Sequence, residues 1–462
     1  YFLVHLLKMV IVEKTSSPSV SIYARNQQQA YGLEGGDLVS LITLKASPLP
    51  TDKAPAPLFL VTVLDKSGSM SGSKMEMMKD TMRRLVAKLR PMDSLTMVMY
   101  DTNVSVLLPP TLMDESNAEK AIELIDSLRV GSSTNLSGGL IEGLNCIPSN
   151  LPKSTVISTL LLTDGHANYG ATKAEQIIEL MNHTWNKEDA PAKSAVYTFG
   201  YGSDHCSQLL KDIADAGNGM YYYIENGDRI ADCFADVLGG LLSVMAQNLA
   251  ITIESMDENV KIKDVLTEYS STIISEGKKV RVSLSDIQSD ESRDIPIRLV
   301  LNDTSSKGDL RLLKVSLECY DSIAEKIHTE SLSLSIPRVQ ELTDEQKSID
   351  IEIDGHINRV ETCEILKQVK ELGDKNQCEK AREIIDEQIN KIKNSVSAEL
   401  PLCIRLVKDL QLAKDSMKSF QQFTSEGAHR ISNFSASHSR QRAAPQGYEM
   451  EFDGFTYVND SR

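Results

Sequence analysis

The stretch Leu58–Met70 reads LFLVTVLDKSGSM and decides both the fold and the site. Its apolar run from Leu58 to Leu64 is typical of a buried β-strand, which Asp65 ends. Ser67 and Ser69 follow at alternate positions, so the strand delivers one carboxylate and two hydroxyl groups to one point. Hard oxygen donors of this kind suit Mg²⁺, and also Mn²⁺ or Ca²⁺. No His or Cys stands at metal-ligand spacing here, which disfavours zinc.

Two later segments supply further oxygen donors. Thr134 lies in the loop sequence GSSTN, and Asp164 follows the apolar run in STLLLTDG. Neutral hydroxyl ligands leave most of a cation's charge uncompensated, so a metal held here would still attract a carboxylate from a partner protein. The alternative is a chance DxSxS motif in a serine-rich chain, which three pieces in the right order disfavour.

Strand-like and helix-like segments alternate from Leu58 to Ala246. This alternation predicts an α/β domain with a doubly wound, mainly parallel sheet. Ligands bind outside the carboxyl ends of the strands in such sheets, and Asp65 and Asp164 both follow predicted strands. The fold and the chemistry of the side chains therefore indicate the same edge of the sheet. A long helix is expected over Arg229–Ala246, and it would connect the site to the rest of the chain.

Outside this domain the sequence pattern changes twice. Short β runs separated by turns predict an antiparallel β-sandwich, and we expect an earlier β segment to join it, so that the α/β domain is inserted into the sandwich. Apolar stripes at helical spacing then predict a helical hairpin with a third helix. The predicted parts are an N-terminal extension (1–19), the β segment (20–50), the α/β domain (57–246), the β-sandwich (247–340), the C-terminal helical hairpin region (343–418) and a partly flexible tail (419–462).

The composition limits the partners and the compartment. The chain has 462 residues and a formal net charge of −16, which disfavours nucleic acid and anionic membranes as partners because both require basic surfaces, so we expect neither a nucleic-acid nor a membrane partner. Its seven cysteines are dispersed without a CxxC pair, so a reducing compartment is favoured. The apolar stretch 1–12 is too short to span a bilayer, and we expect no secretion signal and a cytoplasmic protein. A secreted protein is the alternative if the amino terminus is incomplete.

The set Asp65, Ser67, Ser69, Thr134 and Asp164 resembles the metal-ion-dependent adhesion site of von Willebrand factor type A (VWA) domains. The resemblance implies that the three hydroxyl groups bind the metal directly. It also implies that the two carboxylates hold the metal through waters and orient the hydroxyls. Lys66 departs from the family, which usually has an uncharged residue at this position. A cation there could weaken metal binding if it faced the site, and we expect it to point to solvent.

The resemblance extends beyond the motif. A β segment precedes APLFLVTVLDKSGSM, and GGLLSVMAQNLAITI, a helical hairpin and SFQQFTSEGAHRISNFSASHSRQR follow. This order is similar to VWA proteins with a VWA-interdomain helical region, whose plant members include RING-type ubiquitin ligases of the WAVY GROWTH group. The chain has no Cys/His pattern of a RING, so ligase activity is not implied.

No sequence pattern places an enzymatic reaction in this chain. There is no GxSxG elbow or phosphate-binding loop, and the neighbours in Gly202–His205 cannot adopt the geometry of a catalytic triad. His166 and Asp101 lie near the predicted site and receive no role. The sequence therefore predicts a non-enzymatic, cation-dependent protein-interaction module whose partner presents an Asp or Glu. The alternative is an intracellular scaffold or ubiquitin-pathway adaptor that binds through its helical region and carries a structural metal.

Overall fold

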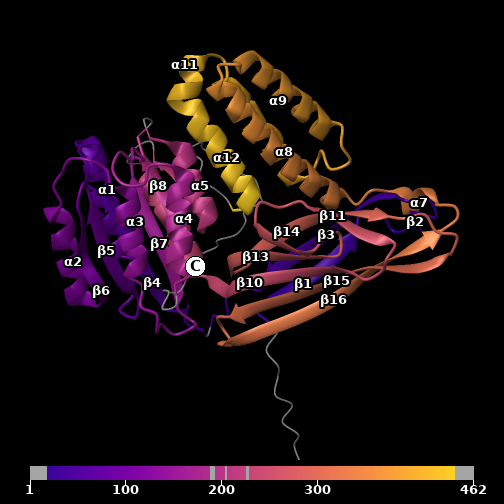
Figure 1. The fold of residues 1–462 in the computed structure, drawn as a ribbon, viewed down its shortest axis with the longest axis horizontal. Coiled ribbons are helices and arrows are strands. Elements are labelled where there is room, and N and C mark those ends of the chain that lie inside the picture. The colour runs from indigo at the N-terminus through magenta and orange to yellow at the C-terminus, as the bar shows by residue number, and fades with distance from the viewer. Residues whose placement is uncertain (1–17, 52, 188–192, 203–204, 225–227, 443–462) are drawn as a thin grey trace, which may run out of the picture.

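A computed structural model describes residues 18–51, 53–187, 193–202, 205–224 and 228–442. It has an α/β part, a two-sheet β part and a helical part, and the helical part lies against both others (Figure 1). Almost all of the predicted N-terminal extension, including the stretch considered for a secretion signal, lies outside these residues. Within them, no helix is long and apolar enough to cross a membrane.

The α/β part is built on a six-stranded sheet in the order β6-β5-β4-β7-β8-β9. All neighbouring strands are parallel except β5 and β6, which are antiparallel. The doubly wound, mainly parallel fold that the sequence predicts is therefore confirmed. The strands are β4 (Leu58–Asp65), β5 (Ser94–Tyr100), β6 (Val104–Leu112), β7 (Val156–Thr163), β8 (Ala195–Tyr201) and β9 (Asn218–Ile224).

Helices cover both faces of this sheet, which explains why β4 and β7 are mostly apolar and are buried along almost their whole length. One face packs against α1, α2 and α6, and the other packs against α3, α4 and α5. The strand order reverses between β4 and β7, so the carboxyl ends of these two strands form the crevice in which such folds bind ligands. The helices are α1 (Ser73–Val86), α2 (Glu115–Ser127), α3 (Leu136–Asn145), α4 (Ala174–Trp185), α5 (Ser207–Ala216) and α6 (Asp228–Leu241).

The β part consists of two sheets that share one apolar core. The strands of the smaller sheet, in spatial order, are β1 (Val20–Asn26), β3 (Gly36–Ala46), β14 (Ser292–Leu301) and β11 (Val260–Val265). The strands of the larger sheet are β12 (Ser270–Ser275), β13 (Lys279–Gln288), β10 (Val244–Ser255), β15 (Gly308–Asp321), β16 (Lys326–Val339) and β2 (Tyr31–Gly32). All pairs are antiparallel except β16 and β2. The α/β part thus lies in the sequence between β3 and β10.

The end of the α/β part differs from the sequence prediction. The last helix ends at Leu241, and β10 begins at Val244, so a helix over Arg229–Ala246 was wrong at its end. The apolar side chains of Val244, Met245 and Ala246 are buried. These residues belong to a strand and not to the helix, because β10 pairs with β13 from Val244 and with β15 from Ala246.

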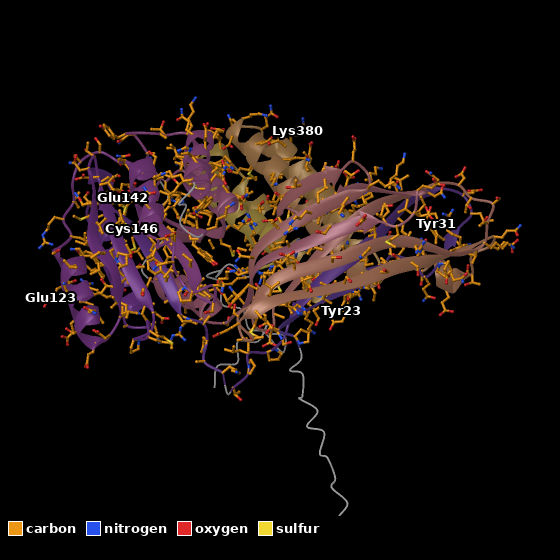
Figure 2. All side chains as sticks on the ribbon, turned by 60° about the horizontal axis from the view of Figure 1, so that its bottom comes forward. Tyr23, Tyr31, Glu123, Glu142, Cys146 and Lys380 are labelled. Atoms are coloured by element: carbon orange, nitrogen blue, oxygen red, sulfur yellow. The ribbon has the colours of Figure 1, made fainter. Side chains whose placement is uncertain are left out.

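Figure 2 shows the parts from another side: Glu123 and Glu142 lie in the α/β part, and Tyr31 lies at the far end of the β part.

The helical part has its own apolar core, formed mainly by α8, α9, α10 and α12. Its elements are α7 (Asp344–Lys347), α8 (Ile351–Asp374), α9 (Cys378–Lys393), α10 (Pro401–Ser416), α11 (Phe420–Gln422), a π-helical turn (Phe423–Gly427) and α12 (Ala428–Arg440). The segment expected to be a partly flexible tail contains α12, a helix that was not predicted from the sequence. Its buried face is rich in serine and histidine, and His438 binds Asp409 of α10 at 2.8 Å. The sequence pattern did not predict this helix, because its buried side chains are mostly polar and their partners are distant in sequence.

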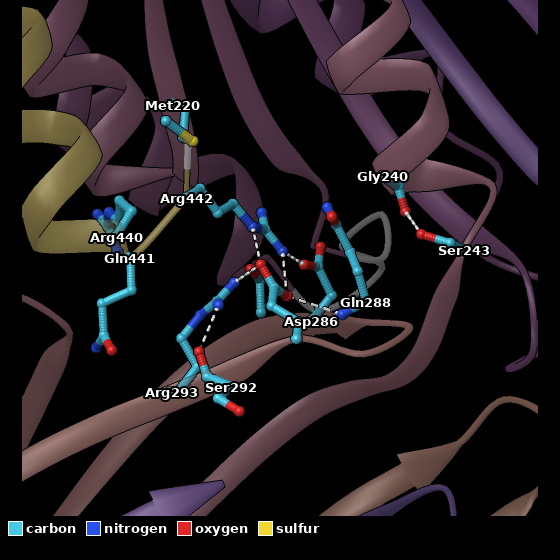
Figure 3. A network of polar contacts seen from close by, with 12 residues as sticks. Met220, Gly240, Ser243, Asp286, Gln288, Ser292, Arg293, Arg440, Gln441 and Arg442 are labelled. Carbon is cyan, nitrogen blue, oxygen red and sulfur yellow. Dashed lines mark hydrogen bonds and ion pairs between the residues drawn. The ribbon is translucent and has the colours of Figure 1, made fainter. Parts of the chain in front are cut away.

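A buried ion-pair network joins the three parts just beyond α12 (Figure 3). The Arg442 guanidinium pairs with Asp286 of β13 and, through Nε at 2.9 Å, with Glu291. Its Nη1 also donates to the hydroxyl of Tyr197 on β8, at 3.3 Å. Arg293 of β14 pairs with Glu291 from the other side. The network therefore fixes the chain after α12 to the β part and to the α/β part at once.

Candidate metal-binding site

The loop after β4 forms the centre of the site. Asp65 is fully buried at the end of the strand, and its Oδ1 accepts a hydrogen bond of 2.8 Å from the backbone N–H of Ser67. This bond bends the chain sharply, and a short 3₁₀ turn over Gly68–Met70 follows. The turn brings the Oγ atoms of Ser67 and Ser69 within 3.1 Å of each other. Ser67 is buried and Ser69 is exposed, so this hydroxyl pair lies at the surface of the crevice.

Two hydroxyl groups that sequence reasoning missed hold the Asp65 carboxylate. Thr163, the last residue of β7, donates to Oδ2 at 2.5 Å, and Tyr100, the last residue of β5, donates to the same oxygen at 3.2 Å. Burial raises the pKa of Asp65 to about 6; hydrogen bonds from Thr163 and Ser67 oppose the rise, and the charge of Asp164 adds to it. The sequence offered one signal for their role: both residues carry hydroxyl groups at the ends of the strands that flank β4.

Backbone hydrogen bonds bring the predicted Thr134 loop to the same place. The Gly68 N–H donates to the carbonyl of Ser132 at 2.8 Å, and the Thr134 carbonyl accepts from the backbone of Asn168 and Tyr169, each at 3.2 Å. The Thr134 N–H donates to the side chain of Asn168 at 2.8 Å. Three loops that are distant in sequence are thus tied together, and Thr134 is buried among them at 1% exposure.

Asp164 follows β7 and is fully buried. Its Oδ2 lies 3.2 Å from the ammonium group of Lys74, in the first turn of α1. Its Oδ1 is also buried and accepts no hydrogen bond from the described part of the chain. A buried carboxylate oxygen without a partner is costly, so this atom favours a cation or an ordered water beside it.

Lys66 does not point to solvent as expected. Its ammonium group lies 2.5 Å from Asp101 Oδ2, and the Lys66 side chain is only 17% exposed. Because Asp101 neutralises this charge, Lys66 is held at the end of β5. Burial raises the pKa of Asp101, but the hydrogen bond and charge of Lys66 outweigh burial and lower it overall. His166 is an exposed loop residue, in keeping with its having no assigned role.

The packing of α3 against Tyr100 provides a test of how this site is supported. A Cβ added at Gly139 would lie 2.4 Å from Cδ1 and 2.7 Å from Cγ of the buried Tyr100 ring. Gly139→Ala should therefore displace Tyr100 from Asp65 and destabilise the protein by about 1–3 kcal/mol. This overpacking outweighs the roughly 1 kcal/mol that alanine gains over glycine in a helix. Chemical denaturation measures the change.

Gly32→Ala is the matched control, because an added Cβ there meets no atom within 4 Å. It should change stability by less than about 0.5 kcal/mol. A Gly139→Ala protein as stable as the control would contradict the tight support of Tyr100.

The comparison with protein families agrees with this architecture. Residues 60–236 match the von Willebrand factor type A domain, so this part of the chain is a VWA domain, as its motif predicted. VWA domains often serve as protein-interaction modules. The solved structure described as von Willebrand factor type A from Catenulispora acidiphila aligns with a TM-score of 0.66 and 15% identity, covering 89% of this chain and 98% of that one. That likeness shows a common fold across all three parts.

Two curated proteins extend the similarity beyond the VWA domain. The chain is 27% identical over 287 residues to E3 ubiquitin-protein ligase WAV3 of Arabidopsis thaliana, which covers 61% of this chain and 36% of that protein. It is 26% identical over 309 residues to an uncharacterized protein of Synechocystis, covering 65% and 70%. The chain thus spans little more than a third of the plant ligase.

Proposed function

We propose that this chain is a protein-interaction module that binds a divalent cation, Mg²⁺ or alternatively Mn²⁺ or Ca²⁺, at the carboxyl ends of β4 and β7. A partner protein would contribute an Asp or Glu carboxylate to the bound cation. In this proposal the chain catalyses no reaction, since capturing a carboxylate requires neither an activated water nor a base. The observation that carries the proposal is Asp164 Oδ1, a fully buried carboxylate oxygen with no hydrogen-bond donor among the described residues.

The donor set fits a hard cation. Two adjacent ligands of an octahedral Mg²⁺ ion lie about 3 Å apart when each is about 2.1 Å from the ion. The hydroxyl oxygens of Ser67 and Ser69 are 3.1 Å apart. The buried Thr134 would add a third hydroxyl from the neighbouring loop. Asp65 and Asp164 would orient these groups and balance the charge of the ion. When bound, the cation supplies a Lewis-acidic position that a partner carboxylate can occupy.

Titration of Mn²⁺ and Mg²⁺ into the metal-stripped full chain tests this proposal. We expect the wild type to bind one cation per chain and Ser67→Ala/Ser69→Ala to show no measurable binding, because two direct ligands are lost. Isothermal titration calorimetry measures both, and circular dichroism verifies that the variant is folded.

Ser270→Ala/Ser271→Ala is the matched control, because it removes two exposed serine hydroxyls from β12, which lies in the larger sheet of the β part. It should bind as the wild type does. A folded wild type that binds neither cation, or a Ser67→Ala/Ser69→Ala protein that binds both normally, would refute the proposal. Either result would favour the alternative, in which the chain is a scaffold or adaptor that binds its partner through the helical part.

A further inference from the structure

Lys74 stands in an unusual position for a lysine. It lies in the first turn of α1, which begins at Ser73, directly after the serine loop of the site. The first turn of a helix carries partial positive charge, so a cation there is unfavourable by about 0.3–1 kcal/mol. The stability of α1 therefore does not explain Lys74, whereas its position beside Asp164 does.

The ion pair between Lys74 and Asp164 is mostly buried. Its Nζ lies 3.2 Å from Asp164 Oδ2; the lysine side chain is 15% exposed and the aspartate side chain is fully buried. Charge–charge interactions are several times stronger at such a site than in water. The ammonium group thus supplies a positive charge to the same carboxylate that is proposed to balance a cation.

A charge count of the three groups gives two consequences. Asp65 and Asp164 contribute two negative charges and Lys74 contributes one positive charge. A divalent cation entering beside these two carboxylates therefore meets one more positive charge than it would without Lys74. Lys74 should therefore repel an incoming cation, and the cation-loaded site should attract a carboxylate more strongly.

We infer that Lys74 is a charge-setting residue that makes cation binding and carboxylate binding cooperative. It weakens the cation's affinity for the partner-free site, and an arriving carboxylate offsets the excess positive charge. This inference rests on the proposed function and adds its regulation: the site loads its cation most tightly when a partner carboxylate is present. By linkage, the cation raises affinity for the carboxylate by the same factor.

The test is Mn²⁺ titration into metal-stripped full chain, in chloride buffer and in acetate buffer, with acetate as the carboxylate probe. In chloride, Lys74→Met should bind Mn²⁺ about tenfold more tightly than the wild type, because repulsion is removed. Acetate should tighten Mn²⁺ binding by the wild type and have a smaller effect on the variant. Without metal, Lys74→Met should also melt at a lower temperature than the wild type, since Asp164 loses its counter-charge.

Two further variants complete the design. Lys74→Gln removes the charge but can still donate an N–H to Asp164, so it tests charge alone if Lys74→Met does not fold. Lys88→Met changes the net charge equally at an exposed lysine just past the end of α1, and it should bind Mn²⁺ as the wild type does.

The outcomes separate the inference from the proposed function. Wild-type binding with equal or weaker binding by both folded Lys74 variants overturns the inference and leaves the proposed function standing. Mn²⁺ binding by the wild type in chloride, with tighter binding by both Lys74 variants and a smaller effect of acetate on them, supports both. If neither the wild type nor the variants bind Mn²⁺ in either buffer, the proposed function fails and the inference fails with it.

Discussion

Arg442→Met is expected to lower the free energy of unfolding by about 3–5 kcal/mol, because it removes the guanidinium that pairs with the buried Asp286. It also leaves Glu291 with Arg293 as its remaining counter-charge. The Arg442 side chain is 11% exposed, and its partners Asp286 and Glu291 are 7% and 12% exposed. Methionine retains most of the apolar stem, so the loss reports the charge and its hydrogen bonds. Urea unfolding followed by circular dichroism, together with fluorescence of Trp185 in α4, measures the change.

Arg84→Met is the matched control, since Arg84 pairs with Asp80 on the surface, where the side chains are 57% and 43% exposed. Exposed pairs of this kind contribute about 0–1 kcal/mol, so this variant should be nearly as stable as the wild type. Equal, small effects of the two substitutions would show that the network in Figure 3 does not hold the three parts together.

The same network also predicts how the stability difference between the wild type and Arg442→Met depends on pH. Burial alone would raise the pKa of Glu291, but the charges of Arg293 and Arg442 lower it to about 2. A depressed carboxylate pKa contributes stability above the unfolded value, near 4.5, and that contribution is lost as the pH falls towards 2. The stability difference between the wild type and Arg442→Met should therefore shrink between about pH 4.5 and pH 2.

Asp65→Asn should separate cation binding from stability. The introduced amide would retain the shape of the side chain and one oxygen for the Ser67 N–H, while the hydroxyls of Thr163 and Tyr100 can rotate to accept from its N–H groups. Because the pKa of Asp65 is raised to about 6, its charged form is unfavourable in the folded protein at neutral pH. We expect the metal-free variant to be more stable than the wild type by up to about 3 kcal/mol at pH 7.5. Cation affinity should fall by about 10- to 100-fold.

The pH dependence of this gain follows from the raised pKa. The protonated Asp65 stabilises the wild type below its unfolded pKa, and this benefit disappears as the pH rises through about 6. The advantage of Asp65→Asn should thus grow as the pH rises from about 4 to about 6 and be fully present above that pH. Thermal melts at pH 4, 6 and 7.5, with and without Mn²⁺, measure the stability difference.

Asp236→Asn controls for removal of a buried charge. Burial raises the pKa of Asp236 on α6 to about 6 as well, and its carboxylate accepts a 3.2 Å hydrogen bond from Tyr222. This variant should also gain stability at neutral pH while binding cations normally. Asp65→Asn protein that binds Mn²⁺ as tightly as the wild type would remove Asp65 from the site.

The parts of the site that lie within one short segment could be predicted from the sequence. Asp65, Ser67 and Ser69 follow a recognisable strand, and Thr134 and Asp164 complete a known order of residue types. Tyr100 and Thr163 could not be assigned roles in the same way, since their contact with Asp65 exists only when β5 and β7 flank β4. The pairs Lys66–Asp101 and Lys74–Asp164 likewise depend on side-chain directions that spacing does not define.

The fold was predictable to a similar degree and for the same reason. Periodicity identifies each strand and helix, and alternation along the chain identifies the parallel sheet. The helix α12 was missed because its burial depends on partners such as Asp409 and Tyr269, which are distant in sequence. The start of β10 was misplaced because an apolar run such as Leu241–Ala246 suits a helix end and a buried strand equally.

The two ends of the VWA domain meet at one turn of the β part. Leu49, on the way into the domain, donates its backbone N–H to the side chain of Ser289, and the carbonyl of Ser243, on the way out, accepts from the backbone of the same residue. Because the entry and exit of the VWA domain are adjacent, evolution can insert or delete the whole domain here without rearranging the core of the β part. Because both chain connections lie at this turn, a force applied to the VWA domain would reach the β part here and through the Arg442 network.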